Sequence, residues 1–216
     1  MARRIVHLFR ESSLGGVTRF RRFLENSESV RALGHQEIII SAGGLSRPPR
    51  LAADVIVSHM VLNRRNLPFF VALRILNPKA TLIHVEHGDC ETLVNSEIGN
   101  LGRFRLLFRS LLYLFDRVVT INRAQDAWLK KFAGLDANKT HLIRPCVCLD
   151  RFLALQSPQG EVRRIGAIGR LAPEKGFDTL VQAFRGIDRP DVSLEIFGQG
   201  TEHARLLKLA EGDRRI

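Results

Sequence analysis

The stretch "GRLAPEKGF" at 169–177 places an arginine and a lysine in a short loop between an apolar run and a helix-forming run. Backbone N–H groups and the helix dipole favour an anion at the first turn of a helix. Arg170 and Lys175 add two positive charges there. The loop lacks the Gly-Lys-Ser/Thr ending of a P-loop, so it predicts a phosphate-like ligand in a protein that is not a P-loop NTPase.

Glycines and polar residues follow several other apolar runs, where ligands of open parallel sheets bind. These positions are Gly15, Gly16, His59, His87 and Asn122, and after the last run Gly198, Gln199 and Gly200. Each first-half position also has a purely structural interpretation. The glycine pair can form a tight turn, and Asn122 can cap the helix that follows it. For His59 we favour a hydrogen-bonded strand-end histidine over a ligand-binding one.

The three cysteines give no disulfide framework, because their number is odd and their spacing is irregular. Cys146 and Cys148 have C-x-C spacing, but no other cysteine lies nearby. Buried structural thiols in a reducing cytoplasm are therefore the favoured interpretation, and we expect neither a metal ion nor an organic cofactor.

Apolar runs alternate with helical patterns along the first three quarters of the chain. We expect strands at 4–9, 37–41, 54–59, 81–87, 116–122 and 140–145, and helices at 17–33, 68–76, 101–115 and 123–134. Gly34 and Gly134 follow two of these helices, as C-terminal caps do. This alternation predicts an α/β fold with a Rossmann-like, doubly wound parallel sheet.

The pattern restarts after the linker-like stretch "CLDRFLALQSPQGE" at 148–161, which contains Pro158 and Gly160. Strands at 163–169 and 192–198 alternate with helices at 177–186 and 202–211. We expect one domain at 1–156 and the beginning of a second, truncated Rossmann-like domain at 157–216. Two strands and two helices cannot cover both faces of a parallel sheet, so we call the second unit incomplete.

The net charge of +11 lies almost entirely in the first domain. Residues 1–156 hold 23 Lys and Arg against 13 Asp and Glu, whereas 157–216 hold 10 against 9. A basic surface suits phosphorylated ligands and anionic lipid, and "RFRLLFR" at 103–109 mixes arginine with Phe and Leu. No nucleic-acid motif is present, so we expect no nucleic-acid partner. No apolar run approaches the roughly 18–20 residues of a membrane span.

Several quoted segments together resemble family 4 (group 1) retaining glycosyltransferases of GT-B fold. "GRLAPEKGFDTLVQAFRGI" and "PDVSLEIFGQGTEHARLLKLA" resemble the start of the family's C-terminal domain. "LGGVTRF", "LGHQEIIIS", "DRVVTIN" and "KTHLIRPCVCLDRF" resemble successive segments of its N-terminal domain. The resemblance covers essentially the whole chain. It implies transfer of a sugar from a nucleoside diphosphate sugar to a saccharide or lipid-linked acceptor in envelope or polysaccharide biosynthesis, with retention of configuration.

The resemblance also implies roles for particular residues. Arg170 and Lys175 would hold the leaving diphosphate, and His87 would lie near the donor sugar, so these three are the expected catalytic residues. Gly15 and Gly16 would approach the donor phosphates, and Gly198, Gln199 and Gly200 would border the nucleotide pocket. The acceptor would contact the loops at 42–50 and 88–97. The family's carboxylates for the donor ribose and sugar would lie beyond residue 216.

Two other classes compete with this interpretation. A dinucleotide-dependent oxidoreductase would carry G-x-G-x-x-G after its first strand, and "RESSLGGV" does not. A truncated, non-catalytic binding module of the same fold remains the alternative, and activity of the 216 residues alone stays open. We expect a cytoplasmic protein, and the basic first domain suits peripheral attachment to the inner face of the cytoplasmic membrane.

Overall fold

The chain forms two compact units, Met1–Leu149 and Asp150–Ile216. The computed structural model describes residues 3–10, 16–40, 48, 50–88, 100–145, 150–156, 160–161 and 163–216, without the side chains of 35–40, 150 and 151. Gly15, the three cysteines and most of the loops at 42–50 and 88–97 lie outside the described residues. The division falls after Leu149, whereas the sequence placed it after residue 156.

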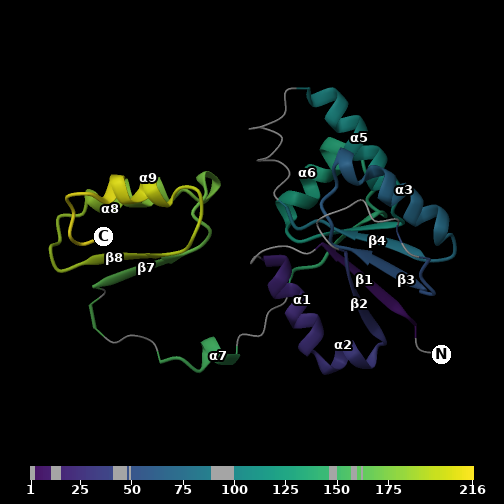
Figure 1. Cartoon of the computed structure of the whole chain (residues 1–216), viewed down its shortest axis with the longest axis horizontal. Helices are drawn as coiled ribbons and strands as arrows, with labels where there is room; N and C mark the ends of the chain where they lie inside the picture. Colours follow the sequence, from purple (N-terminus) through teal and green to yellow (C-terminus); the bar gives the residue numbers. More distant parts are fainter. Residues whose placement is uncertain are drawn as a thin grey trace. The chain divides into compact units, whose positions relative to one another are not determined.

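The first unit is built on a six-stranded parallel sheet (Figure 1). Its strands are β1 (Ile5–Arg10), β2 (His35–Ile40), β3 (Val55–Ser58), β4 (Thr81–Val85), β5 (Arg117–Thr120) and β6 (Thr140–Leu142). They are ordered β2-β1-β3-β4-β5-β6. Because β1 has β2 on one side and β3 on the other, the order reverses at β1. This topology confirms the predicted doubly wound α/β class.

Helices flank this sheet, with α3, α5 and α6 gathered on one side in Figure 1. The helices are α1 (Gly16–Asn26), α2 (Glu28–Ala32), α3 (Leu67–Leu76), α5 (Leu101–Tyr113) and α6 (Arg123–Ala133), with a 3-10 turn η1 (Arg64–Asn66). The main core lies between the sheet and the helices α3, α5 and α6. It packs Val6, Leu8, Ile56, Leu82 and Val118 of the sheet against Phe70, Leu73, Phe108, Leu111, Leu112 and Leu129 of these helices. Both faces of β1 are buried, as expected for a central parallel strand.

The single helix expected at 17–33 is instead two helices, so that prediction was wrong in its continuity. Ser27 has an extended backbone conformation (φ −80°, ψ 114°), and its hydroxyl accepts a hydrogen bond from the Val30 N–H. Serine is a preferred N-cap because its side chain satisfies a free N–H of the following turn. Gly34 follows α2 with φ 79°, as the sequence predicted for a C-terminal glycine.

The second unit contains one two-stranded parallel sheet with helices on one side of it (Figure 1). Its elements are α7 (Asp150–Leu153), β7 (Arg164–Ile168), η2 (Pro173–Lys175), α8 (Phe177–Arg185), β8 (Ser193–Phe197) and α9 (His203–Ala210). A small core joins Leu194, Val181, Phe184 and Leu206. The segment expected as a linker contains the short helix α7, which the sequence analysis missed.

One face of the β7–β8 sheet is open among the described residues. Ile165, Ala167 and Ile196 pack against the small core, whereas Ile168 and Phe197 are 80% and 54% exposed. Parallel sheets are ordinarily covered on both faces. The second unit therefore leaves apolar sheet surface without cover from its own described residues.

We expect the backbone amides of β7 and β8 to exchange hydrogen faster than those of β1, β3 and β4. The open face lets local unfolding occur at a lower free energy than in the six-stranded sheet. Hydrogen exchange followed by mass spectrometry measures this, with light scattering to establish the oligomeric state. Equal protection of both sheets in a monomer would contradict the prediction, whereas self-association would protect the open face.

Candidate functional site

Three histidines meet at the carboxyl edge of the six-stranded sheet. His7 lies within β1, His59 directly follows β3 and His87 lies just after β4, and these strands are neighbours. Nδ1 of His7 lies 2.9 Å from Nε2 of His59, and Nδ1 of His59 lies 2.8 Å from Nε2 of His87. The three side chains therefore form one hydrogen-bonded row, which we call the histidine chain.

Aromatic side chains enclose the middle of the histidine chain. The ring of Phe9 stacks on that of His59 with centroids 4.3 Å apart and planes inclined by 5°. Phe20 of α1 lies against His59 and His87, with centroid separations of 5.3 and 5.7 Å. His59 is only 6% exposed, and His87 is half-buried. The chain thus runs from the interior to a partly open end at His87.

Burial is the main reason why His59 and His87 favour the neutral form. Burial, with smaller contributions from neighbouring His7 and His87, lowers the pKa of His59 from 6.5 to about 2. Burial also lowers the pKa of His87, and Glu86 partly opposes this. A neutral imidazole donates one hydrogen bond and accepts another, which suits the row of contacts observed.

Unfolding of the first unit should become easier as the pH falls below about 6.5. An unfolded histidine binds a proton below that pH, whereas folded His59 does not until about pH 2. Stability is therefore present above the unfolded pKa, and it falls by about 1.4 kcal/mol per pH unit below it for this one group. Urea titrations followed by the fluorescence of Trp128, the only tryptophan, report on this unit.

His59→Phe tests the cause of that acid sensitivity. Phenylalanine keeps the stacking with Phe9 but does not titrate, so the stability of the variant should depend less steeply on pH, by about one proton. An unchanged pH slope in the folded variant would contradict the assignment to His59.

On the other side of β4, Glu86 and Gln125 hold the segment that carries His87. The backbone N–H of Gly88 donates to Glu86 Oε1 at 2.8 Å. Nε2 of Gln125 donates to the carbonyls of Glu86 and Gly88 at 3.2 and 2.7 Å. The predicted cap is confirmed, because Asn122 Oδ1 accepts from the Gln125 N–H at 2.8 Å. The start of α6 thereby holds residues 86–88 in place.

Gly16 is the first residue of α1, and space is open beside it. A Cβ atom added at Gly16 would meet no atom within 4 Å. The first N–H groups of a helix have no partner within it, so an anion could approach here. Phe20, one turn later, contacts His59 and His87, which places the beginning of α1 at the histidine chain.

In the second unit, Arg170 and Lys175 lie in the loop between β7 and α8. Nη2 of Arg170 is 2.5 Å from Glu174 Oε1, and the Arg170 side chain is 69% exposed. The Lys175 side chain is exposed and forms no hydrogen bond or ion pair within the described part of the chain. Gly176 then adopts a left-handed conformation (φ 64°) and turns the backbone into α8. The sequence could not show that Arg170 is paired.

The loop after β8 lies directly against the loop after β7. The Leu171 N–H donates to the Gln199 carbonyl at 2.9 Å, and the Gly169 N–H donates to the Phe197 carbonyl at 3.0 Å. A Cβ atom at Gly198 would overlap the Gly169 carbonyl oxygen, and one at Gly200 would overlap the Leu171 carbonyl. Close backbone packing alone therefore explains why both positions are glycine, although either can still border a ligand.

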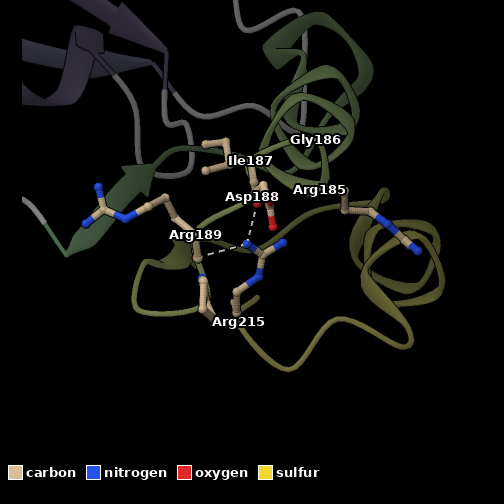
Figure 2. A pocket seen from close by; sticks show the side chains of 7 residues that line it. Arg185, Gly186, Ile187, Asp188, Arg189 and Arg215 are labelled. Carbon is tan, nitrogen blue, oxygen red and sulfur yellow. Dashed lines mark hydrogen bonds between the residues drawn. The ribbon is translucent and has the colours of Figure 1, made fainter.

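A separate pocket of about 360 Å³ lies at the other end of α8, with three arginines in its lining (Figure 2). Each guanidinium already has partners. Arg215 donates to the Ile187 carbonyl at 2.6 Å, Arg185 to the Leu209 carbonyl at 2.6 Å, and Arg189 pairs with Asp191. The carboxyl end of a helix also disfavours anions. We therefore assign this pocket a structural role.

Residues 156–213 match the model of the family described as "Glycosyl transferases group 1". This segment contains Arg170 and Lys175 in the loop after β7, and Gly198 and Gly200 in the loop after β8. Over this segment the chain is similar to the group 1 glycosyltransferases, as the sequence resemblance indicated. No curated protein matches the chain in sequence.

Solved glycosyltransferase structures share the fold of nearly the whole chain. A glycosyltransferase from Rickettsia africae aligns with 96% of this chain at 19% identity and a TM-score of 0.64, and Anabaena HepE in complex with UDP aligns with 96% at 15% and 0.63. The Staphylococcus aureus TarM G117R mutant, in complex with fondaparinux, α-GlcNAc-glycerol and UDP, aligns with 73% at 15% and 0.50. The chain spans 64%, 65% and 30% of those three chains.

The structure brings together some of the expected site residues, and it shows a further residue, His7, in contact with His59. Gly16 and His87 lie at the histidine chain, and Arg170, Lys175, Gly198, Gln199 and Gly200 lie at two adjoining loops of the second unit. His7 was missed, and His59 was taken as structural. Within the described ranges, no group of three or more His, Cys, Asp or Glu is arranged to hold a metal ion.

Proposed function

We propose that the protein transfers a sugar from a nucleoside diphosphate sugar to a saccharide or lipid-linked acceptor, with retention of configuration. The observation that carries this proposal is the group 1 match at 156–213, which includes the basic loop. The GT-B likeness of both units supports it, and so do the UDP complexes of two of the solved structures.

The chemistry of the reaction explains the basic loop. As the glycosidic bond breaks, negative charge grows on the leaving diphosphate, and a positive group fixed nearby stabilises that charge. The Lys175 ammonium makes no hydrogen bond or ion pair to a described residue, and Arg170 can exchange its contact with Glu174 for one with a phosphate oxygen. Arginine binds phosphate through a planar pair of N–H groups, whereas lysine acts as a compact charge.

In the first unit, His87 is proposed to hydrogen-bond the donor sugar, and the backbone at Gly16 is proposed to approach the phosphates. Neutral His87 suits a sugar hydroxyl because it can donate or accept without carrying charge. The open space beside Gly16 leaves room for a phosphate oxygen. Gly15 is assigned to the same loop by the resemblance alone.

Calorimetry with a panel of nucleoside diphosphates tests the proposal. We expect saturable binding of at least one of them, weakened in Lys175→Ala. Lys208→Ala is the matched control, since Lys208 is also exposed in the second unit but lies near the end of α9. Absence of binding by every nucleotide would sink the proposal. Binding without turnover would favour the non-catalytic module, and the anomeric configuration of a product would test retention.

We also propose peripheral attachment to the inner, anionic face of the cytoplasmic membrane through α5. Leu106 on its outer face is 69% exposed, and neighbouring Arg103 and Arg105 are exposed and pair with no described carboxylate. Apolar and basic side chains on one helix face are typical of interfacial binding. None of the helices in the described ranges combines the length and apolar character needed to cross a bilayer.

Sedimentation with liposomes should show binding to acidic vesicles at low salt and release at high salt, because electrostatic attraction is screened. The double variant Arg103→Gln/Arg105→Gln should bind less. Arg64→Gln/Arg65→Gln removes the same charge from the exposed turn η1 and serves as control. Equal losses of vesicle binding in both double variants would point to net charge rather than to α5. Full recovery of the wild-type protein in the supernatant under all conditions would refute attachment.

A further inference from the structure

We propose that His59 and His7 position His87: they couple its tautomer and its protonation to those of buried His7. With both hydrogen bonds intact, the histidine chain accepts at most one extra proton, at one end or the other. The significance of this for donor recognition rests on the proposed function, whereas the coupling itself follows from the geometry.

The argument starts from the middle ring. His59 uses both ring nitrogens, at 2.9 Å from His7 and 2.8 Å from His87. A neutral imidazole carries one N–H, so His59 must donate one of these bonds and accept the other. The two hydrogen bonds therefore point in the same direction along the chain.

Two directions are possible, and they leave different atoms at the open end. In one, His7 donates to His59, which donates to Nε2 of His87, so that Nδ1 of His87 carries the proton. In the other, His87 donates through Nε2, and its Nδ1 is a bare acceptor. The direction of the chain therefore decides whether His87 offers a ligand a donor or an acceptor.

An extra proton fixes the direction. Protonated His7 must donate to His59, and protonated His87 must do the same from the other side. If both ends were protonated, His59 would have to accept twice and lose its own proton, which a buried ring at 6% exposure does not do. The two ends therefore titrate as a coupled pair.

Two further titratable groups of the described residues act on His59 and His87. His84 on β4 affects His59 and His87 through its charge, and Glu86 at the end of β4 affects His87. Phe9 and Phe20 cover the rings with apolar surface. Glu86 attracts a proton toward His87, so an anionic donor at that end would add to the same bias. Donor binding should thus change the tautomer of His7 at the far end.

Ring-nitrogen NMR of the 216-residue chain tests the coupling without any assay of activity. Nitrogen-15 shifts distinguish the two neutral tautomers from the charged ring. Between about pH 5 and pH 8 we expect His59 to stay neutral and the three rings together to gain no more than one proton. Titration of His59 in this range, or simultaneous protonation of His7 and His87, would overturn the proposal.

Two substitutions each keep one of the two hydrogen bonds of His59 and remove the other. The amide of His59→Asn takes the place of Nδ1 and can keep the bond to His87, whereas that of His59→Gln takes the place of Nε2 and can keep the bond to His7. In both variants His7 and His87 should titrate independently. His141 is exposed, and His141→Gln should leave the titration of all three rings unchanged. Continued coupling in both folded variants would overturn the proposal, and the wild-type titration decides it if neither folds.

Addition of a nucleoside diphosphate sugar completes the test. We expect bound donor to shift the His7 ring resonances in the wild type and not in the folded His59→Gln variant. Bound donor without a shift at His7 would overturn the coupling between donor and His7. A chain that shows the coupled titration but binds no donor would retain the coupling and lose the proposed function.

Discussion

Lys175→Ala is expected to slow turnover of the nucleotide-sugar donor by about a hundred- to a thousand-fold. Loss of one preorganised positive group from a developing oxyanion typically costs about 2.7–4 kcal/mol. The diphosphate is more negative in the transition state than in the bound donor, so the loss should fall mainly on kcat, with a smaller change in donor affinity. Lys175→Arg should rescue only in part, because a planar guanidinium does not replace a compact ammonium.

Arg170→Ala should also slow turnover of the donor. The contact of Arg170 with Glu174 offers a second way to test the role of Arg170. Arg170 contacts Glu174 at 2.5 Å and must exchange that contact for a phosphate oxygen. Glu174→Gln should therefore tighten donor binding modestly, since it frees the guanidinium. Steady-state rates and calorimetry on folded variants measure both effects, with Lys208→Ala as control. Near wild-type rates in folded Lys175→Ala and Arg170→Ala would contradict the proposal that these two side chains hold the diphosphate.

The second large effect is expected on stability. Gly198→Ala and Gly200→Ala should each destabilise the second unit by about 1–3 kcal/mol or more, because the added Cβ overlaps a backbone carbonyl. Backbone cannot move aside as the end of a flexible side chain can. In a unit with so small a core, this is a large fraction of the total stability.

Gly16→Ala is the matched contrast to these two substitutions. Its Cβ meets no atom within 4 Å, so the first unit should keep its stability. If the proposed phosphate contact exists, the same methyl group should weaken donor binding. Hydrogen exchange of peptides from 193–206 follows the second unit, and Trp128 fluorescence follows the first. Wild-type protection of folded Gly198→Ala would contradict the packing explanation.

The order of strands and helices was predictable because apolar runs and glycine caps are local signals. The break at Ser27 was missed because apolar residues of a helical pattern lie on both sides of it, Phe23 and Leu24 before it and Val30 and Leu33 after it, and the backbone angles show the new cap. The segment at 150–153 was read as a linker because four residues are too few to show a helical period.

The histidine chain was only partly predictable. His59 and His87 follow strands, which the sequence shows, but their contact depends on β3 and β4 being neighbours. His7 lies inside a buried strand and looked like an ordinary core position. A partial signal existed, since His59 and His87 follow two successive strands of a parallel sheet. The pairing of Arg170 with Glu174 depends on side-chain conformation in an exposed loop, which the sequence does not specify.

The release of nucleoside diphosphate from a panel of nucleotide sugars, with saccharide and lipid-linked acceptors, tests the central claim most directly. Release by the wild-type chain with at least one donor, reduced about a hundred-fold or more in Lys175→Ala and unchanged in Lys208→Ala, is the result that the account predicts. Equal release by the wild type and Lys175→Ala, or no release and no binding with any donor, would contradict it.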